Sequence, residues 1–264
     1  MKPLRPIVLV TGASSGIGAA LAREFAMHGH EVVLVARRKA RLHKLAKEIA
    51  ATGAPKPIVI VADLARPQAV ASLRKALARQ RVEPQYVVNN AGFGLVGRAE
   101  RLDRDEQLAM IDLNIRALTA LSLAFANSLA RHKGGVLNVG SMAGFLPGPG
   151  MAVYYASKAY VLSFSAALHQ EFKARGVRIT ALCPGPVPTE FRERAGAREE
   201  LGPGFLTVSS EKVAHDGYRG LMAGRMVVVP GRLNRLITLL MPLIPRAVIL
   251  TATDRLMRRR GRLR

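Results

Sequence analysis

The chain has 264 residues, of which 49% are apolar, and its formal net charge is +22. This length suits one large α/β domain, or less readily two small ones, and the apolar content excludes a disordered chain. The single cysteine, Cys183, excludes an internal disulfide and a cysteine-rich metal site, and the six histidines have no ligand-like spacing, so no metal is expected.

The N-terminal region combines a predicted strand with a glycine-rich turn. The apolar run at residues 7–10 follows basic residues, as in a signal peptide, but it is short and leads straight into the turn, so we interpret it as the first buried strand of a cytoplasmic protein. In the turn at residues 11–18, Gly12 permits a tight bend, Gly16 lets the backbone approach a pyrophosphate, and Gly18 lets the next helix lie close to the strand. The free N–H groups of that helix attract phosphate. The turn therefore predicts a dinucleotide site that also includes Ser14, Ser15 and Ile17, the alternative being a glycine-rich connection without a ligand.

The residues after the second predicted strand indicate which dinucleotide binds. The strand at residues 31–35 is followed by Ala36, Arg37 and Arg38. A site for NAD(H) has an acidic residue near this position, whereas a 2′-phosphate is bound by arginine, whose planar fork matches phosphate. We therefore predict NADP(H), with NAD(H) less favoured; alternatively, the two arginines only begin a solvated helix.

The middle of the chain contributes another strand and a strongly apolar helix. The strand at residues 86–88 runs into the sequence N-N-A-G at residues 89–92, where two amides can bond neighbouring backbone. Residues 103–130 are predicted to be helical, and the run at 117–125 is apolar nearly all round. Such a helix is covered on both sides. We expect the sheet on one side and a second protomer on the other, unless the monomer has an unusually deep core.

A hydroxyl after a strand precedes a tyrosine and a lysine on one helix face. Ser141 follows an apolar run, at the point where a strand opens into a loop. The chain lacks proline and glycine from position 151 to 175, which predicts a helix ending at Gly176, and residues four apart on a helix share a face, as Tyr154 and Lys158 do. An ammonium about 4 Å from a phenol is worth roughly 4 kcal/mol at an effective dielectric of about 20, which lowers the pKa of the phenol toward neutrality. The pattern predicts a general acid/base at Tyr154 beside a substrate oxygen held by Ser141, although Tyr-x-x-x-Lys alone also fits a partly exposed helix face.

These motifs, in this order, resemble the short-chain dehydrogenase/reductase family over roughly residues 5–230, in an NADP(H)-preferring subgroup with a prolonged C-terminus. The resemblance implies a single doubly wound α/β domain of Rossmann type, with a parallel seven-stranded sheet flanked by helices. Much of the helix at 151–172 is apolar as well, like the run at 117–125. Family members commonly pair through these two helices, so a homodimer at least is expected. The resemblance also implies Asn114 as a fourth catalytic residue, whose carbonyl opens its helix to hold a water linked to Lys158.

The remaining cofactor contacts are implied by the resemblance alone. Tyr154 and Lys158 serve the cofactor as well as the reaction, and the other positions are Asp63, Leu64, Asn90, Ala91, Gly92, Pro184, Gly185, Val187 and Thr189. We expect residues 1–231 to form the catalytic domain, with a substrate lid at about 190–209, and residues 232–264 to form an extension packed on it or beside it.

The extension is apolar and then basic. Residues 236–244 are too short for a transmembrane span and contain Pro242, so they predict one or two short helices. Residues 255–264 include six arginines. Solvated charge, an anionic membrane surface and an acidic carrier stay open as explanations, while nucleic acid is not expected because no recognition module is present.

The first functional hypothesis is an NADPH-dependent reductase that interconverts a small-molecule carbonyl and an alcohol. A second hypothesis keeps this chemistry but makes the protein a peripheral-membrane reductase of lipid-like or acyl substrates. The third is a non-catalytic NADP(H)-binding sensor or scaffold. The sequence does not identify the substrate or the physiological direction.

Overall fold

The centre of the protein is one parallel sheet. The computed structural model describes residues 3–197 and 203–259. Its strands are β1 (Arg5–Thr11), β2 (Val32–Ala36), β3 (Ile58–Val61), β4 (Val82–Asn89), β5 (Gly135–Val139), β6 (Arg178–Leu182) and β7 (Val227–Val228). They lie in the order β3-β2-β1-β4-β5-β6-β7, and every neighbouring pair is parallel. The predicted seven-stranded Rossmann-type sheet is confirmed, and its strand order reverses between β1 and β4, where doubly wound folds bind ligands.

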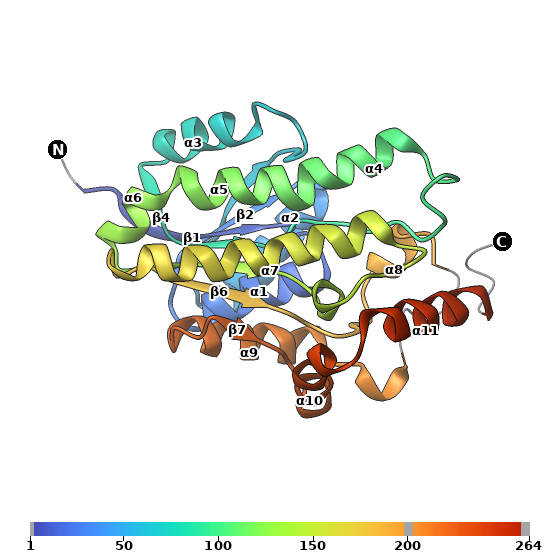
Figure 1. The fold of residues 1–264 in the computed structure, drawn as a ribbon. Helices are drawn as coiled ribbons and strands as arrows, with labels where there is room; N and C mark the ends of the chain where they lie inside the picture. Colours follow the sequence, from blue (N-terminus) through green and yellow to red (C-terminus); the bar gives the residue numbers. More distant parts are fainter. Residues whose placement is uncertain (1–2, 198–202, 260–264) are drawn as a thin grey trace.

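Helices cover both faces of the sheet (Figure 1). One layer holds α1 (Gly16–Met27), α2 (Lys39–Ala51) and α9 (Ser210–Met222). The other holds α3 (Ala69–Arg79), α4 (Arg104–Ile111), the π-helix η1 (Asp112–Ala117), α5 (Leu118–Ala124), α6 (Ala126–Arg131) and α7 (Ala152–Lys173). The predicted helix at 103–130 is therefore a series of helical segments interrupted by one π-turn.

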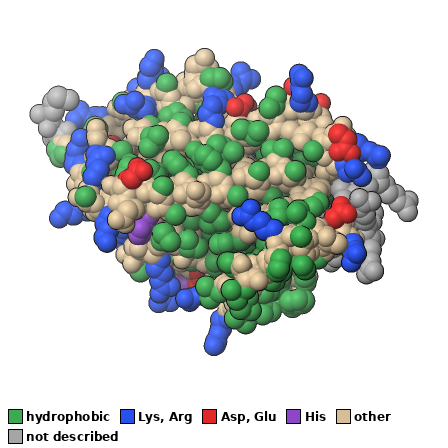
Figure 2. Space-filling view, in the orientation of Figure 1, with side chains coloured by type: hydrophobic (Ala, Val, Ile, Leu, Met, Phe, Trp, Pro, Cys, Tyr) green, Lys and Arg blue, Asp and Glu red, His purple; other side chains and the backbone are tan. Residues whose placement is uncertain are grey.

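The second layer also presents apolar side chains to the outside. Figure 2 shows them along the face that α5 and α7 occupy in Figure 1. Leu108, Ile111 and Leu123 are exposed on α4 and α5. Exposed apolar groups on these helices are what the expected homodimer requires, and the homodimer stays a prediction.

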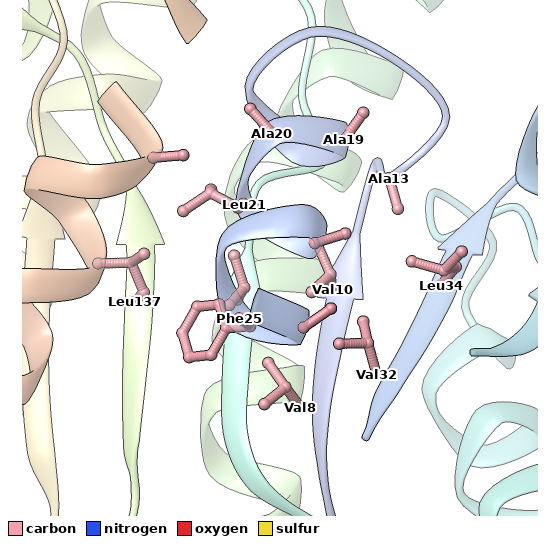
Figure 3. Packing of buried hydrophobic residues seen from close by; sticks show 14 of the residues in the cluster. Val8, Val10, Ala13, Ala19, Ala20, Leu21, Phe25, Val32, Leu34 and Leu137 are labelled. Atoms are coloured by element: carbon pink, nitrogen blue, oxygen red, sulfur yellow. The ribbon is translucent and has the colours of Figure 1, made fainter. Parts of the chain in front are cut away.

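Along each strand, core side chains point alternately to the two faces of the sheet. Val8 and Val10 of β1 pack with Leu21 and Phe25 of α1 on one face of the sheet (Figure 3). Ile7 and Leu9 point to the opposite face, into the cluster formed with the second helix layer. Because both faces are covered, the central strands are continuous apolar runs without polar alternation.

Five further helical elements follow β6 in the described part of the chain. They are α8 (Phe191–Arg194), the 3-10 turns η3 (Gly204–Leu206) and η4 (Met241–Leu243), α10 (Arg232–Leu240) and α11 (Arg246–Arg259); a further 3-10 turn, η2 (Met142–Phe145), follows β5. The predicted lid at 190–209 includes α8 and η3, while its residues 198–202 lie outside the described part of the chain.

The C-terminal helical extension is confirmed as two helices, α10 and α11, separated by a segment that contains Pro242 and Pro245. Across residues 3–197 and 203–259, no helix combines the length and apolar character needed to cross a membrane. The division of the chain at residue 231 stays a prediction.

Candidate active site

A cavity of about 670 Å³ opens at the carboxyl ends of the central strands. Every residue predicted to contact the cofactor lines it, from Gly12 after β1 to Thr189 after β6, and so do Ser141, Tyr154 and Lys158. Asn114 lies just behind the wall, in η1. The cavity volume is within the range of small-molecule and cofactor sites.

The glycine turn after β1 has a tight backbone that lies close to neighbouring protein segments and leaves the start of α1 accessible to a ligand. Gly12 and Gly16 have positive φ angles of 64° and 53°, which side chains rarely adopt. A Cβ on Gly18 would lie 2.3 Å from the carbonyl oxygen of Gly12, and one on Gly16 would lie 2.9 Å from Cγ2 of Thr189. Ser15 precedes α1 without capping it through its side chain, so the first N–H groups of α1 are open to an anion.

Asn90 fastens the end of β4 to this turn. Its Nδ2 donates to the carbonyl oxygens of Thr11 at 2.9 Å and Gly12 at 3.3 Å. The Thr11 hydroxyl donates to the Val88 carbonyl and accepts from the N–H groups of Asn90 and Ala91. The turn is therefore held in one conformation by side chains from two neighbouring strands.

At the end of β2, Arg38 reaches across the mouth of the turn. It donates to Ser14 Oγ at 2.9 Å, to Ser15 Oγ at 2.7 Å and to Glu190 Oε2 at 2.6 Å. Arg41 also binds the Glu190 carboxylate. Hydrogen bonds from Arg41 and Arg38 lower the pKa of Glu190 to about 2. Two guanidinium groups thus converge on one anion at this end of the cavity.

The opposite end of the cavity collects the predicted catalytic side chains. Ser141 follows β5, where its Oγ accepts from the Ala143 N–H at 3.1 Å, and it is hydrogen-bonded to Tyr154. Lys158 follows Tyr154 by one turn of α7 and is 7% exposed. Its Nζ donates to the Val139 carbonyl at 2.8 Å and lies 5.8 Å from the centre of the Tyr154 ring. A phenol, a hydroxyl and a buried amine therefore share one small volume.

The predicted lowering of the Tyr154 pKa is wrong for this structure. Burial raises the pKa of Tyr154 to about 12, and the hydrogen bond with Ser141 only partly opposes it. Burial also lowers the pKa of Lys158 to about 8. An ammonium about 4 Å from the phenol would lower its pKa. In the structure Lys158 Nζ instead donates a hydrogen bond to the Val139 carbonyl, and burial opposes the charged form of both groups. The phenol consequently holds its proton at neutral pH.

Asn114 is anchored within η1. Its Oδ1 accepts from the Phe93 N–H at 3.1 Å, and its Nδ2 donates to the Phe93 carbonyl at 3.0 Å and to Ser157 Oγ at 3.1 Å. A Cβ on Gly92 would lie 2.8 Å from this Oδ1 and 3.8 Å from Lys158 Nζ. Asn114 thus ties the loop after β4 to α7 beside the lysine, and π-turns of this kind often occur at functional sites.

Several apolar residues of the cavity were not predicted from the sequence. Phe191 faces Tyr154 with ring centroids 5.2 Å apart. They also include Phe93, Leu146, Met151, Leu206 and Met241. These five lie after β4, between η2 and α7, in η3 and at the start of η4, and no local motif predicts that they come together. The sequence offered a signal for Phe191 and Leu206, because both lie in the segment at 190–209 that was interpreted as the substrate lid.

Comparisons with known proteins agree with this geometry. The profile of the short chain dehydrogenases matches residues 6–200. The chain belongs to the short-chain dehydrogenase/reductase family. A sulfoacetaldehyde reductase of Chromohalobacter salexigens is 37% identical over 215 residues, which cover 78% of this chain and 84% of the relative.

Solved structures give the same assignment. A short-chain dehydrogenase from Sphingobium yanoikuyae in complex with NADPH superposes with a TM-score of 0.78 at 33% identity, covering 92% of this chain and 97% of its own. The bulky-bulky ketone specific alcohol dehydrogenase from Comamonas testosteroni gives 0.73 at 30% identity, with 93% and 97% covered. The prediction of an NAD(P)-dependent oxidoreductase acting on CH–OH or C=O groups is confirmed.

Proposed function

We propose that the protein is an NADPH-dependent reductase that interconverts a small-molecule carbonyl and an alcohol, with Tyr154 as its general acid/base. The observation that carries the proposal is one cavity with Tyr154, Ser141 and Lys158 at one end and the glycine turn with Arg38 at the other. Oxidation of NADPH by a panel of ketones and aldehydes tests it. Tight NADPH binding without any turnover would favour a cofactor sensor instead.

The residues present fit a dinucleotide. Glycine at positions 12, 16 and 18 keeps the turn tight, because a Cβ there would meet neighbouring protein atoms, and the turn lines the cavity in front of the open N–H groups of α1, where a pyrophosphate can bind. Arg37 and Arg38 would hold a 2′-phosphate, and Asp63 and Leu64 line the cavity nearby for the adenine. When bound, the nicotinamide supplies or accepts the hydride.

The side chains around Tyr154 supply the proton and hold the substrate. The phenol is protonated at neutral pH because burial raises its pKa to about 12, so Tyr154 can donate to a carbonyl oxygen. Ser141 holds the same oxygen through its hydroxyl. The charged form of Lys158 stabilises the phenolate left behind, because this buried ammonium is weakly screened and lies 5.8 Å from the centre of the Tyr154 ring. Asn114 positions the loop and helix around the lysine, and Phe191 excludes water from the phenol.

The NADP(H) preference predicts a selective effect at Arg38. We expect Arg38→Gln to raise the Kd for NADPH by about 10- to 100-fold, because hydrogen bonds to charged groups are worth about 1.5–3 kcal/mol. The Kd for NADH should change much less, since it lacks the 2′-phosphate. Titration of both cofactors measures this, with Arg23→Gln as control because Arg23 pairs with Glu48 on the surface outside the cavity. Equal weakening of both cofactors would contradict the preference.

A specific observation favours a second candidate, a reductase of lipid-like substrates at a membrane surface. Helix α10 turns its polar residues inward and its leucines outward. Asn234 and Thr238 are buried, while Leu236, Leu239 and Leu240 are 52%, 65% and 49% exposed. Asn234 causes this orientation, since its Nδ2 donates to the carbonyl oxygens of Pro230 and Leu206, both at 3.0 Å. Figure 2 shows apolar side chains gathered in the region that α10 occupies in Figure 1.

The surroundings of this apolar face suit an anionic bilayer. Arg232, Arg235 and Arg246 are exposed beside it, and each basic residue near an anionic surface contributes about 1 kcal/mol. Met241, directly after α10, lines the cavity. The exposed apolar face of α10 is therefore followed in the chain by a residue of the cavity that holds Tyr154.

Co-sedimentation with vesicles of phosphatidylcholine and phosphatidylglycerol tests the second candidate. We expect binding at low salt that falls by about tenfold or more in the double variant Leu239→Glu, Leu243→Glu, because the charges oppose burial of the apolar face. Met27→Glu, at an exposed apolar residue of α1, is the matched control. Absence of binding at low salt removes this candidate. A loss of self-association in the double variant would instead show that a second protomer covers α10.

A further inference from the structure

We propose that Glu190 is a latch: its carboxylate occupies Arg38, which is expected to bind the 2′-phosphate, together with the nearby Arg41, so that NADP(H) must displace Glu190 and thereby loosen α8, which covers Tyr154. The inference rests on the proposed cofactor preference and adds a residue that couples the two ends of the cavity. According to this proposal, the position of α8 depends on whether the bound cofactor carries a 2′-phosphate.

The first observation is the contact at the phosphate end. Arg38 Nη1 lies 2.6 Å from Glu190 Oε2, and Arg41 binds the other carboxylate oxygen. Arg38 also donates to the hydroxyls of Ser14 and Ser15 in the glycine turn. A carboxylate held by two guanidinium groups beside that turn has the charge sign and the acceptor geometry of a phosphate. Glu190 therefore occupies the donors that a phosphate would need.

The second observation is what the next residue does. Phe191 begins α8 and faces Tyr154 with ring centroids 5.2 Å apart and an interplanar angle of 50°. A Cβ on Gly94 would lie 2.8 Å from Phe191 Cζ and 3.2 Å from Tyr154 Cδ2, so the two rings meet beside Gly94. A substrate carbonyl must reach this phenol. Glu190, which binds Arg38 and Arg41, and Phe191, which packs against Tyr154, are consecutive in the chain. Release of Glu190 from the arginines therefore moves Phe191 relative to Tyr154.

The latch is weak enough to open. The side chains of Arg38, Arg41 and Glu190 are 43%, 50% and 41% exposed, and ion pairs open to solvent contribute little. A phosphate monoester carries a charge of about −1.5 to −2 near neutral pH, against one for a carboxylate, and offers three acceptor oxygens. The 2′-phosphate therefore competes well for Arg38 and Arg41, whereas NADH has no group that displaces Glu190.

The other end of α8 offers a matched control. Arg194 pairs with Glu106 of α4 at 3.2 Å and lies over the Phe93 ring at 4.5 Å. Glu106→Gln removes the same kind of charge from a contact of the same helix but leaves Arg38 and Arg41 untouched. If loosening of α8 alone changes cofactor affinity, both variants will show the change. If the change comes from freeing Arg38 and Arg41, only Glu190→Gln will show it.

Cofactor titration of the full chain tests the latch. The chain has no tryptophan, so the fluorescence of the reduced cofactor is read without interference, and calorimetry with adenosine 2′-monophosphate isolates the phosphate end. We expect Glu190→Gln to lower the Kd for NADPH and for adenosine 2′-monophosphate by about three- to tenfold, the range for two solvent-exposed ion pairs. The Kd for NADH, and all three values in Glu106→Gln, should stay within about twofold of wild type.

Hydrogen exchange provides a second readout. NADPH, but not NADH, should raise the exchange of the α8 amides in the wild type, and in Glu190→Gln these amides should exchange faster before any cofactor is added. A weaker or unchanged NADPH affinity in Glu190→Gln, in an enzyme that prefers NADPH, would overturn the latch while leaving the cofactor preference intact. Equal affinity of the wild type for NADPH and NADH would overturn both.

Discussion

Replacing Tyr154 by phenylalanine is expected to lower kcat for carbonyl reduction by about 10²- to 10⁴-fold, the usual contribution of a positioned general acid. The ring that packs against Phe191 is kept, so NADPH binding should change by no more than about twofold. Because burial raises the pKa of Tyr154 to about 12, the phenol is the proton donor throughout the neutral range. The loss should therefore be similar at about pH 6 and about pH 9. Steady-state kinetics with a responsive ketone, combined with cofactor titration, measures both quantities.

The neighbouring tyrosine supplies the control. Tyr155 also lines the cavity, and its ring lies against Gly148, where a Cβ would be 2.3 Å from the ring carbon Cγ. Tyr155→Phe keeps that packing and removes only the hydroxyl, so kcat should remain within about threefold of wild type. If Tyr155→Phe lost turnover while Tyr154→Phe kept it, the acid/base assignment would pass to the other residue.

The parts of the fold and site that the sequence predicted are those encoded by local patterns. The glycines at 12, 16 and 18 allow backbone conformations and approaches that other residues do not, so their spacing identifies the turn. Tyr154 and Lys158 are one helical turn apart, which fixes a shared face as soon as α7 is predicted. The apolar runs at residues 7–10, 31–35 and 86–88 predicted individual strands, whereas the parallel seven-stranded sheet was implied by the resemblance to the short-chain dehydrogenase/reductase family.

The parts that were missed depend on contacts between distant segments. The pKa of Tyr154 depends on how completely the surrounding loops remove water, which no spacing predicts. Glu190 meets Arg38 across 152 positions of sequence. Hydrophobic periodicity alone would assign the leucines of α10 to the core. In the structure they face outward because Asn234 donates a hydrogen bond to the carbonyl of Leu206, and periodicity cannot identify this distant partner.

Replacing Lys158 by methionine is expected to lower kcat by about 10²- to 10³-fold, the effect of removing one preorganised electrostatic contact in a site closed to water. Methionine has a similar length and no charge, so the volume beside Tyr154 stays filled. The Val139 carbonyl loses its donor, which destabilises the variant by about 1–3 kcal/mol at every pH. Activity alone would not separate a catalytic role from a structural one, but the pH dependence of stability does.

The pKa of Lys158 falls from its ordinary 10.5 to about 8 in the folded protein, because burial opposes the charged form. Between these two values the unfolded chain binds the proton and the folded protein does not, so the free energy of unfolding of the wild type rises with pH across this window. The rise amounts to about 3 kcal/mol, and Lys158→Met removes it. Relative to wild type, the variant should therefore be most stable below about pH 8 and should lose about 3 kcal/mol of that advantage by about pH 10.5. Urea unfolding at both ends of the window measures the change, with Lys173→Met, an exposed lysine of the same helix, as control. If the stability difference between Lys158→Met and the wild type does not vary with pH, the pKa of Lys158 is not lowered by burial. The electrostatic role assigned to Lys158 beside Tyr154 would then fail as well.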